Sequence, residues 1–171
     1  MKLLSIDPGQ SGGLALFQYD DKLALLKTID TPYDKKEKSY KYRDIYAFLV
    51  EWEPDLVVLE HTLAIASSGT STAKQIGIGE GMWLCLFSLL QIEYIYSYPA
   101  VWTKQLGLKN DKTLTIGANK KTHIDLASRL YPDFKSNFTG PKGGSKDGVA
   151  DAVLIGEAWY RKHKSEVSNV H

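Results

Sequence analysis

The fold is set by the first stretch of the chain, KLLSIDPGQSGGLALF, which covers residues 2–17. The apolar run at residues 2–6 predicts a buried β-strand, and the turn Asp7-Pro8-Gly9 ends it. Residues 12–17 predict a second strand after a glycine turn, and residues 23–28 predict a third. The chain therefore begins with a three-stranded meander, and Asp7 lies at the carboxyl end of its first strand.

Helical and extended patterns alternate along the rest of the chain. Ile45, Phe48, Leu49 and Trp52 recur with helical spacing, and a β-rich run follows at residues 55–60. Later patterns predict a glycine-rich helix at 73–90, a strand at 94–98 and helices at 102–106, 120–131 and 147–163. This order predicts an α/β fold in which helices flank a central mixed five-stranded sheet. We expect a single domain over residues 1–171, with a flexible tail after residue 164.

Composition favours an ordinary globular protein, because 43% of the residues are hydrophobic and 24% are charged. The single cysteine, Cys85, cannot form an internal disulfide or a zinc-binding pair, and its apolar neighbours predict a buried side chain. The apolar run at the N-terminus is too short for a signal peptide, and no apolar run is long enough to span a membrane. We therefore expect a soluble intracellular protein with no membrane partner.

Charge is segregated along the chain although the net charge is only +1. Residues 104–146 carry eight lysines and Arg129 against three aspartates, a net charge of +6, which leaves about −5 for the remainder. A basic segment beside an acidic cluster is typical of an enzyme that binds a polyanion near a metal site. A solvated lysine-rich surface would give the same pattern.

Four acidic residues occupy positions where an unpaired carboxylate is costly. Asp7 and Glu60 each end an apolar strand, and burying an unpaired charge is unfavourable. Asp147 and Asp151 are four residues apart on the last helix, so their like charges share one face and repel. Two divalent ions about 3.5–4 Å apart can activate a water and stabilise the leaving oxygen in phosphodiester cleavage. Because Mg²⁺ prefers hard carboxylate oxygens, the set predicts a magnesium-dependent nuclease.

Each of these acids also has a structural explanation when it is taken singly. Asp7 before Pro-Gly fits a turn, and Glu60 could pair with a lysine at the strand end. Asp147 could complement the dipole at a helix N-terminus, and Asp151 could be an exposed polar residue. The combination of the four in this order is much more specific than any one of them.

Several motifs resemble those of the RuvC-like Holliday junction resolvases, in particular the phage and organellar branch. They span residues 2–160 and are Ile6-Asp7-Pro8-Gly9 with Ser11-Gly12-Gly13-Leu14-Ala15, Val57-Val58-Leu59-Glu60, residues 102–108, Lys120-Lys121 with Ala127 and Leu130-Tyr131-Pro132, and residues 146–152. The resemblance implies a ribonuclease-H-like fold and a homodimer that makes paired symmetric nicks across a four-way DNA junction. It also implies two Mg²⁺ ions per active site, with Mn²⁺ as a substitute. The host compartment would be the cytoplasm of a bacterium or a phage-infected cell, or an organelle.

Carried over by position, Asp7, Glu60 and Asp151 match the catalytic metal ligands of the family. Many of its members place the penultimate acid three residues before the last, where this chain has Gly148, so Asp147 departs from the pattern. Its four-residue spacing still keeps both acids on one helix face, and Asp147 completes the predicted set. The lysines predicted to contact DNA phosphates are Lys104, Lys109, Lys112, Lys120, Lys121, Lys142 and Lys146, although each could equally be a solvated surface residue.

Other functions compete with junction resolution. The main alternative is a structure-selective nuclease of the same fold that acts on other branched DNA, flaps or RNA-containing substrates, because specificity would lie in loops 31–42, 61–72 and 133–146. A non-catalytic DNA-binding module would not require the complete acidic set. A sugar-kinase or actin-like ATPase needs two such domains, for which 171 residues leave no room.

Overall fold

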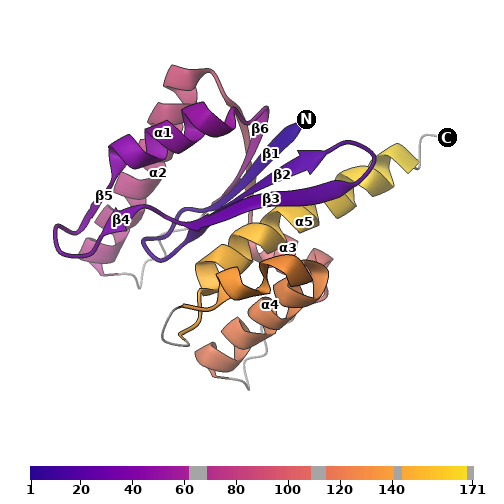
Figure 1. Cartoon of the computed structure of the whole chain (residues 1–171). Coiled ribbons are helices and arrows are strands. Elements are labelled where there is room, and N and C mark those ends of the chain that lie inside the picture. The colour runs from indigo at the N-terminus through magenta and orange to yellow at the C-terminus, as the bar shows by residue number, and fades with distance from the viewer. Residues whose placement is uncertain (62–68, 109–114, 141–143, 169–171) are drawn as a thin grey trace.

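A five-stranded mixed sheet forms the middle layer of the computed structural model, which describes residues 1–61, 69–108, 115–140 and 144–168 (Figure 1). Its strands are β1 (Lys2–Asp7), β2 (Gly13–Tyr19), β3 (Leu23–Asp30), β6 (Leu56–Glu60) and β7 (Glu93–Ser97), in the order β3-β2-β1-β6-β7. The first three strands pair antiparallel, whereas β1, β6 and β7 are parallel. The predicted mixed five-stranded sheet is therefore confirmed.

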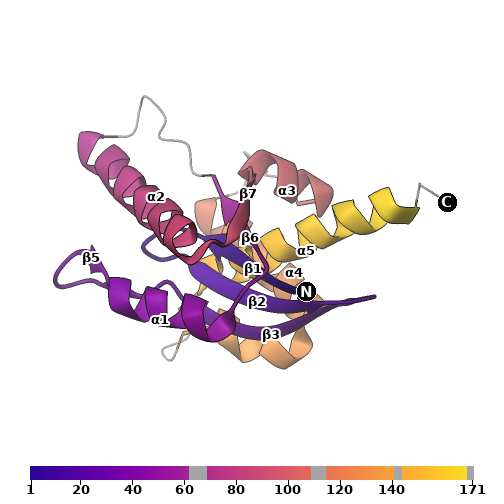
Figure 2. The same ribbon diagram turned by 90° about the horizontal axis from the view of Figure 1, so that it is seen from above.

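Helices cover both faces of this sheet, which gives three layers (Figure 2). One face carries α1 (Tyr42–Trp52) and α2 (Thr70–Leu90), and the other carries α3 (Pro99–Gln105), α4 (Ile116–Leu130) and α5 (Asp147–Ser168). Side chains alternate along β1, so that Leu4 and Ile6 join the core under α1 and α2 while Leu3 joins the core under α5. Both faces of the central strands are buried, which explains their continuous apolar sequences.

Glycines allow α5 to lie directly against the turn between β1 and β2. A Cβ atom at Gly13 would come within 2.6 Å of the Val149 Cα atom, and one at Gly148 would collide with the Ser11 carbonyl oxygen. Gly12 and Gly148 form an isolated β-bridge, and the buried Ser5 hydroxyl donates to the Ala152 carbonyl at 2.6 Å. These contacts place the N-terminal end of α5 beside the carboxyl end of β1.

Three local expectations were wrong. The 133–146 segment is not simply a loop, because a 3-10 helix, η1 (Pro132–Phe138), occupies its first half and buries Phe138 completely in the core. The polar 31–41 segment contains a short hairpin of β4 (Tyr33–Asp34) and β5 (Ser39–Tyr40). Cys85 lies on the outer face of α2 and is exposed. Its apolar neighbours in sequence point to other faces of the helix, so proximity in sequence did not indicate burial.

None of the described helices combines the length and the apolar character that crossing a membrane would require.

Candidate active site

Three elements bring the four predicted carboxylates to one edge of the sheet. Asp7 and Glu60 end the neighbouring parallel strands β1 and β6, and parallel strands present their carboxyl ends at the same edge. The first two turns of α5 bring Asp147 and Asp151 to that edge. The negative charges of the three other acids all raise the pKa of Asp7, so the four carboxylates form one electrostatic cluster.

Asp7 has the most perturbed environment of the four acids. Burial at the strand end raises the pKa of its carboxyl to about 8, and repulsion by Glu60 is the next largest cause. Asp151 and Asp147 raise it further, whereas a hydrogen bond from the Gly9 backbone N–H to Asp7 Oδ1, at 3.1 Å, lowers it. A divalent cation would offset both the cost of burying this negative charge and its repulsion by the neighbouring carboxylates.

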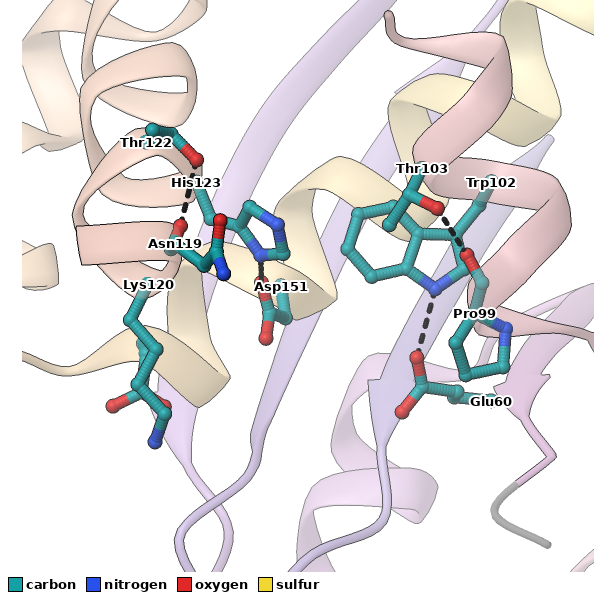
Figure 3. A network of polar contacts seen from close by, with 10 residues as sticks. Glu60, Pro99, Trp102, Thr103, Asn119, Lys120, Thr122, His123 and Asp151 are labelled. Atoms are coloured by element: carbon teal, nitrogen blue, oxygen red, sulfur yellow. Dashed lines mark hydrogen bonds and ion pairs between the residues drawn. The ribbon is translucent and has the colours of Figure 1, made fainter. Parts of the chain in front are cut away.

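Glu60 is held by an indole ring from α3. The Trp102 Nε1–H donates to Glu60 Oε1 at 2.7 Å, and the Trp102 side chain is almost fully buried (Figure 3). Burial raises the pKa of Glu60 to about 7, and repulsion by Asp151 adds to the increase. The hydrogen bond from Trp102 opposes this increase because it stabilises the charged carboxylate.

Asp151 is held in the same way by an imidazole from α4. His123 Nδ1 lies 2.7 Å from Asp151 Oδ1, and because a carboxylate can only accept, the Nδ1–H donates. The rings of His123 and Trp102 meet edge to face with centroids 5.4 Å apart. Figure 3 shows the Trp102 indole lying between His123 and Glu60. The two aromatic side chains thus link the carboxylate of β6 to that of α5.

Asp147 makes an ion pair with Lys120 of α4, with 2.5 Å between Nζ and Oδ2. The hydrogen bond to Asp147 raises the pKa of the Lys120 ammonium, with further contributions from Asp151 and Asp7. Packing limits the position of the penultimate acid. A side chain at position 148 would collide with the Ser11 carbonyl, which excludes an acid there, and this chain carries its acid one residue earlier.

The donor set fits a hard divalent cation, because it consists of four carboxylates with mutual repulsion at a surface edge. Each acid has an N–H donor on one oxygen, from Gly9, Trp102, His123 or Lys120. Over the described ranges, no three His, Cys, Asp or Glu side chains are already grouped to hold one ion. Ligation would therefore need side-chain adjustments.

The predicted DNA-binding lysines have different surroundings. Lys104 and Lys121 are exposed on α3 and α4, the two helices that supply Trp102 and His123 to the carboxylates. Lys120 pairs with Asp147, and Lys146 Nζ lies 2.6 Å from Asp30 Oδ2 at the end of β3. The remaining three, Lys109, Lys112 and Lys142, lie outside the described residues.

The roles of Trp102 and His123 were not predicted from the sequence. Trp102 stands in a motif that carried the family resemblance, but an aromatic residue in a short helix is equally typical of a core position. His123 lies between a basic and an apolar part of α4 and belongs to no recognisable spacing with the acids. Only the packing of α3 and α4 across α5 brings these two residues to the site.

The mixed five-stranded sheet and its two helical layers match the ribonuclease-H-like fold of the RuvC type, which confirms the fold predicted from the sequence. RuvC of T. thermophilus in complex with a Holliday junction substrate has a TM-score of 0.61 and 17% identity, covering 95% of this chain and 96% of RuvC. The fowlpox virus Holliday junction resolvase has a TM-score of 0.60 and 18% identity, with 95% and 99% covered.

The yeast mitochondrial Holliday junction resolvase, Ydc2, also has a TM-score of 0.60, with 13% identity over 93% of this chain and 77% of the yeast protein. The sequence itself matches no known family profile and no curated protein. At these identities the likeness to solved structures establishes the fold.

Proposed function

We propose that this chain is a metal-dependent endonuclease that resolves four-way DNA junctions by paired symmetric phosphodiester cleavage. The observation that carries the proposal is the convergence of Asp7, Glu60, Asp147 and Asp151 at one sheet edge of a fold that solved junction resolvases share. The activity belongs inside the cell, where its DNA substrate lies, in a bacterium, a phage-infected cell or an organelle.

The four carboxylates would hold two Mg²⁺ ions, with Mn²⁺ as a substitute, and Asp7 at the centre of the cluster would be the ligand they share. When bound, the ions would activate a water and stabilise the leaving oxygen. Trp102 and His123 keep the Glu60 and Asp151 carboxylates oriented. Lys104 and Lys121 would bind the phosphate backbone and set affinity and position rather than sequence.

Paired cuts need two active sites, so we propose that the chain acts as a homodimer. The outer face of α2 fits such an interface, because Ile78, Gly81, Cys85 and Leu89 share one side of the helix. Leu89 is 73% exposed, and a Cβ atom at Gly81 would meet no other residue within 4 Å, so the backbone is open to a partner helix. An exposed apolar stripe of this kind is typical of a docking surface.

Leu89→Glu should shift the protein from dimer to monomer in sedimentation and abolish paired nicking. Leu26→Glu is the matched control, because Leu26 is 45% exposed on β3, away from α2. Equal masses for Leu89→Glu and the wild type would exclude the α2 interface.

Cleavage of a synthetic four-way junction tests the proposal directly. Linear duplex, flap and RNA–DNA hybrid substrates serve as controls, each with Mg²⁺ and with EDTA. We expect paired symmetric nicks in the junction alone, and only with metal. Cleavage of flaps or hybrids with the junction spared would instead identify a structure-selective nuclease that uses the same carboxylates.

A further inference from the structure

A cleft of about 700 Å³ opens directly beside the carboxylate edge. Its lining comes from Glu60, the turn after Asp7, α2 and the β4–β5 hairpin. This volume lies within the range of about 300–1,000 Å³ that is usual for ligand sites. Because Glu60 borders both the cleft and the carboxylate cluster, a molecule in the cleft would lie next to the reacting phosphate.

The hairpin wall of the cleft is firmly held. Asp34 Oδ1 accepts the backbone N–H groups of Lys36 at 2.8 Å and Glu37 at 3.1 Å, which fixes the turn. Tyr40 is buried and donates to the Pro8 carbonyl at 3.1 Å, so the hairpin is tied to the turn that follows Asp7. Tyr33 packs edge to face on Tyr40 with centroids 5.2 Å apart and remains partly exposed to the cleft.

The lining of the cleft combines the groups that recognise a nucleotide. Tyr33 and Ile76 offer a ring and an apolar side chain against which a base could stack. Gln10 and Gln75 bring two amides to the same space, with Gln10 Nε2 3.2 Å from Gln75 Oε1, and amides can both donate to and accept from base edges. Lys35, which is exposed at the hairpin turn, offers a positive charge to a phosphate.

The charges also indicate how a nucleotide would lie. Glu80, which is outside the proposed metal set and accepts from the Tyr96 hydroxyl, places a carboxylate in the lining; this disfavours a phosphate there and suits the amino groups of a neutral base. Lys38, on the hairpin wall of the cleft, adopts a left-handed backbone with φ of 48°. A lysine rarely adopts this conformation, and such residues collect at binding sites.

We propose that this cleft binds one unstacked nucleotide of the DNA junction, adjacent to the phosphate that is cut, with its base against Tyr33 and its edge facing the hydrogen-bonded amide pair of Gln10 and Gln75. This inference rests on the proposed junction-resolving function and adds a base-contacting site to it. Occupancy of the cleft would let the enzyme favour some bases beside the cut, in addition to recognising the branched shape of the junction.

Binding of modified junctions tests the site without requiring cleavage. The protein carries Asp7→Asn, and the probes are fluorescent four-way junctions with one abasic residue at each position within three nucleotides of the cut. Removing a stacked base at the critical position should weaken binding about fivefold or more. In the further variant Tyr33→Leu/Gln75→Ala, the intact junction should bind more weakly, and the abasic residue should cause little additional loss.

Gln18→Ala is the matched control, because Gln18 is a glutamine near the far end of β2 that hydrogen-bonds to Asp20. It should leave the abasic profile unchanged, and thermal unfolding of both variants checks that they fold. Two results would overturn the nucleotide site alone. In one, the abasic residue weakens binding by the same factor whether or not the protein carries the cleft substitutions. In the other, an abasic residue has no effect on binding at any of the tested positions. Failure to prefer the junction over linear duplex would overturn the proposed function together with this site.

Discussion

Trp102→Phe isolates the hydrogen bond that orients Glu60. The substitution removes the Nε1–H that donates to Glu60 Oε1 at 2.7 Å but keeps an aromatic ring beside His123. A hydrogen bond to a charged group contributes about 1.5–3 kcal/mol. Here the hydrogen bond from Trp102 also lowers the pKa of Glu60, which burial raises. We therefore expect Glu60 to bind protons more tightly and to hold a cation less well.

The expected magnitude is a loss of about 10- to 100-fold in Mn²⁺ affinity, the usual effect of removing a partner of a metal ligand. That range agrees with the free energy of the hydrogen bond, because about 1.4 kcal/mol corresponds to a factor of ten. Isothermal titration calorimetry at pH 7.5 measures it directly, independently of any nuclease assay. Raising the pH should recover part of the loss, because protons compete less for Glu60.

Trp159→Phe makes the same chemical change away from the site. Its indole N–H is buried and has no hydrogen-bond partner among the described residues, so its removal should leave Mn²⁺ affinity unchanged. Thermal unfolding of both variants separates metal binding from stability. Equal Mn²⁺ affinities for Trp102→Phe and Trp159→Phe would refute the orienting role of Trp102.

Three further predictions concern charge. Asp7→Asn should abolish cleavage, keep junction binding in a mobility-shift assay, and raise the unfolding temperature of the metal-free protein above pH 8 by removing a buried, repelled charge. In the metal-free wild type, the pKa of Asp7 is raised from 3.8 to about 8, so the folded state binds a proton at Asp7 more tightly than the unfolded state. The contribution of Asp7 to the free energy of unfolding should therefore fall as the pH rises from about 4 to 8. Urea titrations at each pH measure this free energy, and a flat profile over that range would contradict the prediction. Lys104→Ala and Lys121→Ala should each reduce the slope of log binding constant against log salt by about 1, whereas Lys27→Ala, on β3, should leave it unchanged.

The parts of the fold that local pattern controls could be predicted from the sequence. The continuous apolar runs of β1 and β6 predict strands buried on both faces, and an acid at the end of each run identifies the edge of the sheet. By contrast, the β4–β5 hairpin was missed because its two-residue strands carry no alternation, and it is held by the Asp34 turn and the Tyr40 contact. The Tyr40–Pro8 contact spans 32 residues and leaves no local signal, whereas Asp34 binds the backbone two and three positions later, which is a local turn signal that the sequence interpretation overlooked.

The partners of the carboxylates were unpredictable for a related reason. Trp102 and Glu60 are 42 residues apart, and His123 and Asp151 are 28 apart, so no spacing connects them. Residue type gives little help, because a tryptophan in an amphipathic helix is usually a core residue, and Trp102 is indeed almost fully buried. Its polar N–H is the informative feature, since a buried indole needs an acceptor and Glu60 supplies one.

The four-residue spacing of Asp147 and Asp151, which differs from that of the resolvases the sequence resembles, is linked to how the fold packs. The helix α5 approaches the β1–β2 turn so closely that Gly13 and Gly148 are required where the backbones meet. An acid at position 148 would force the helix away from the turn and carry Asp151 away from Asp7. One residue earlier, Asp147 keeps the helix in contact and still shares a face with Asp151. Backbone packing therefore excludes an acid at position 148, and the close approach that requires glycine is also what brings the helix acids to the strand ends.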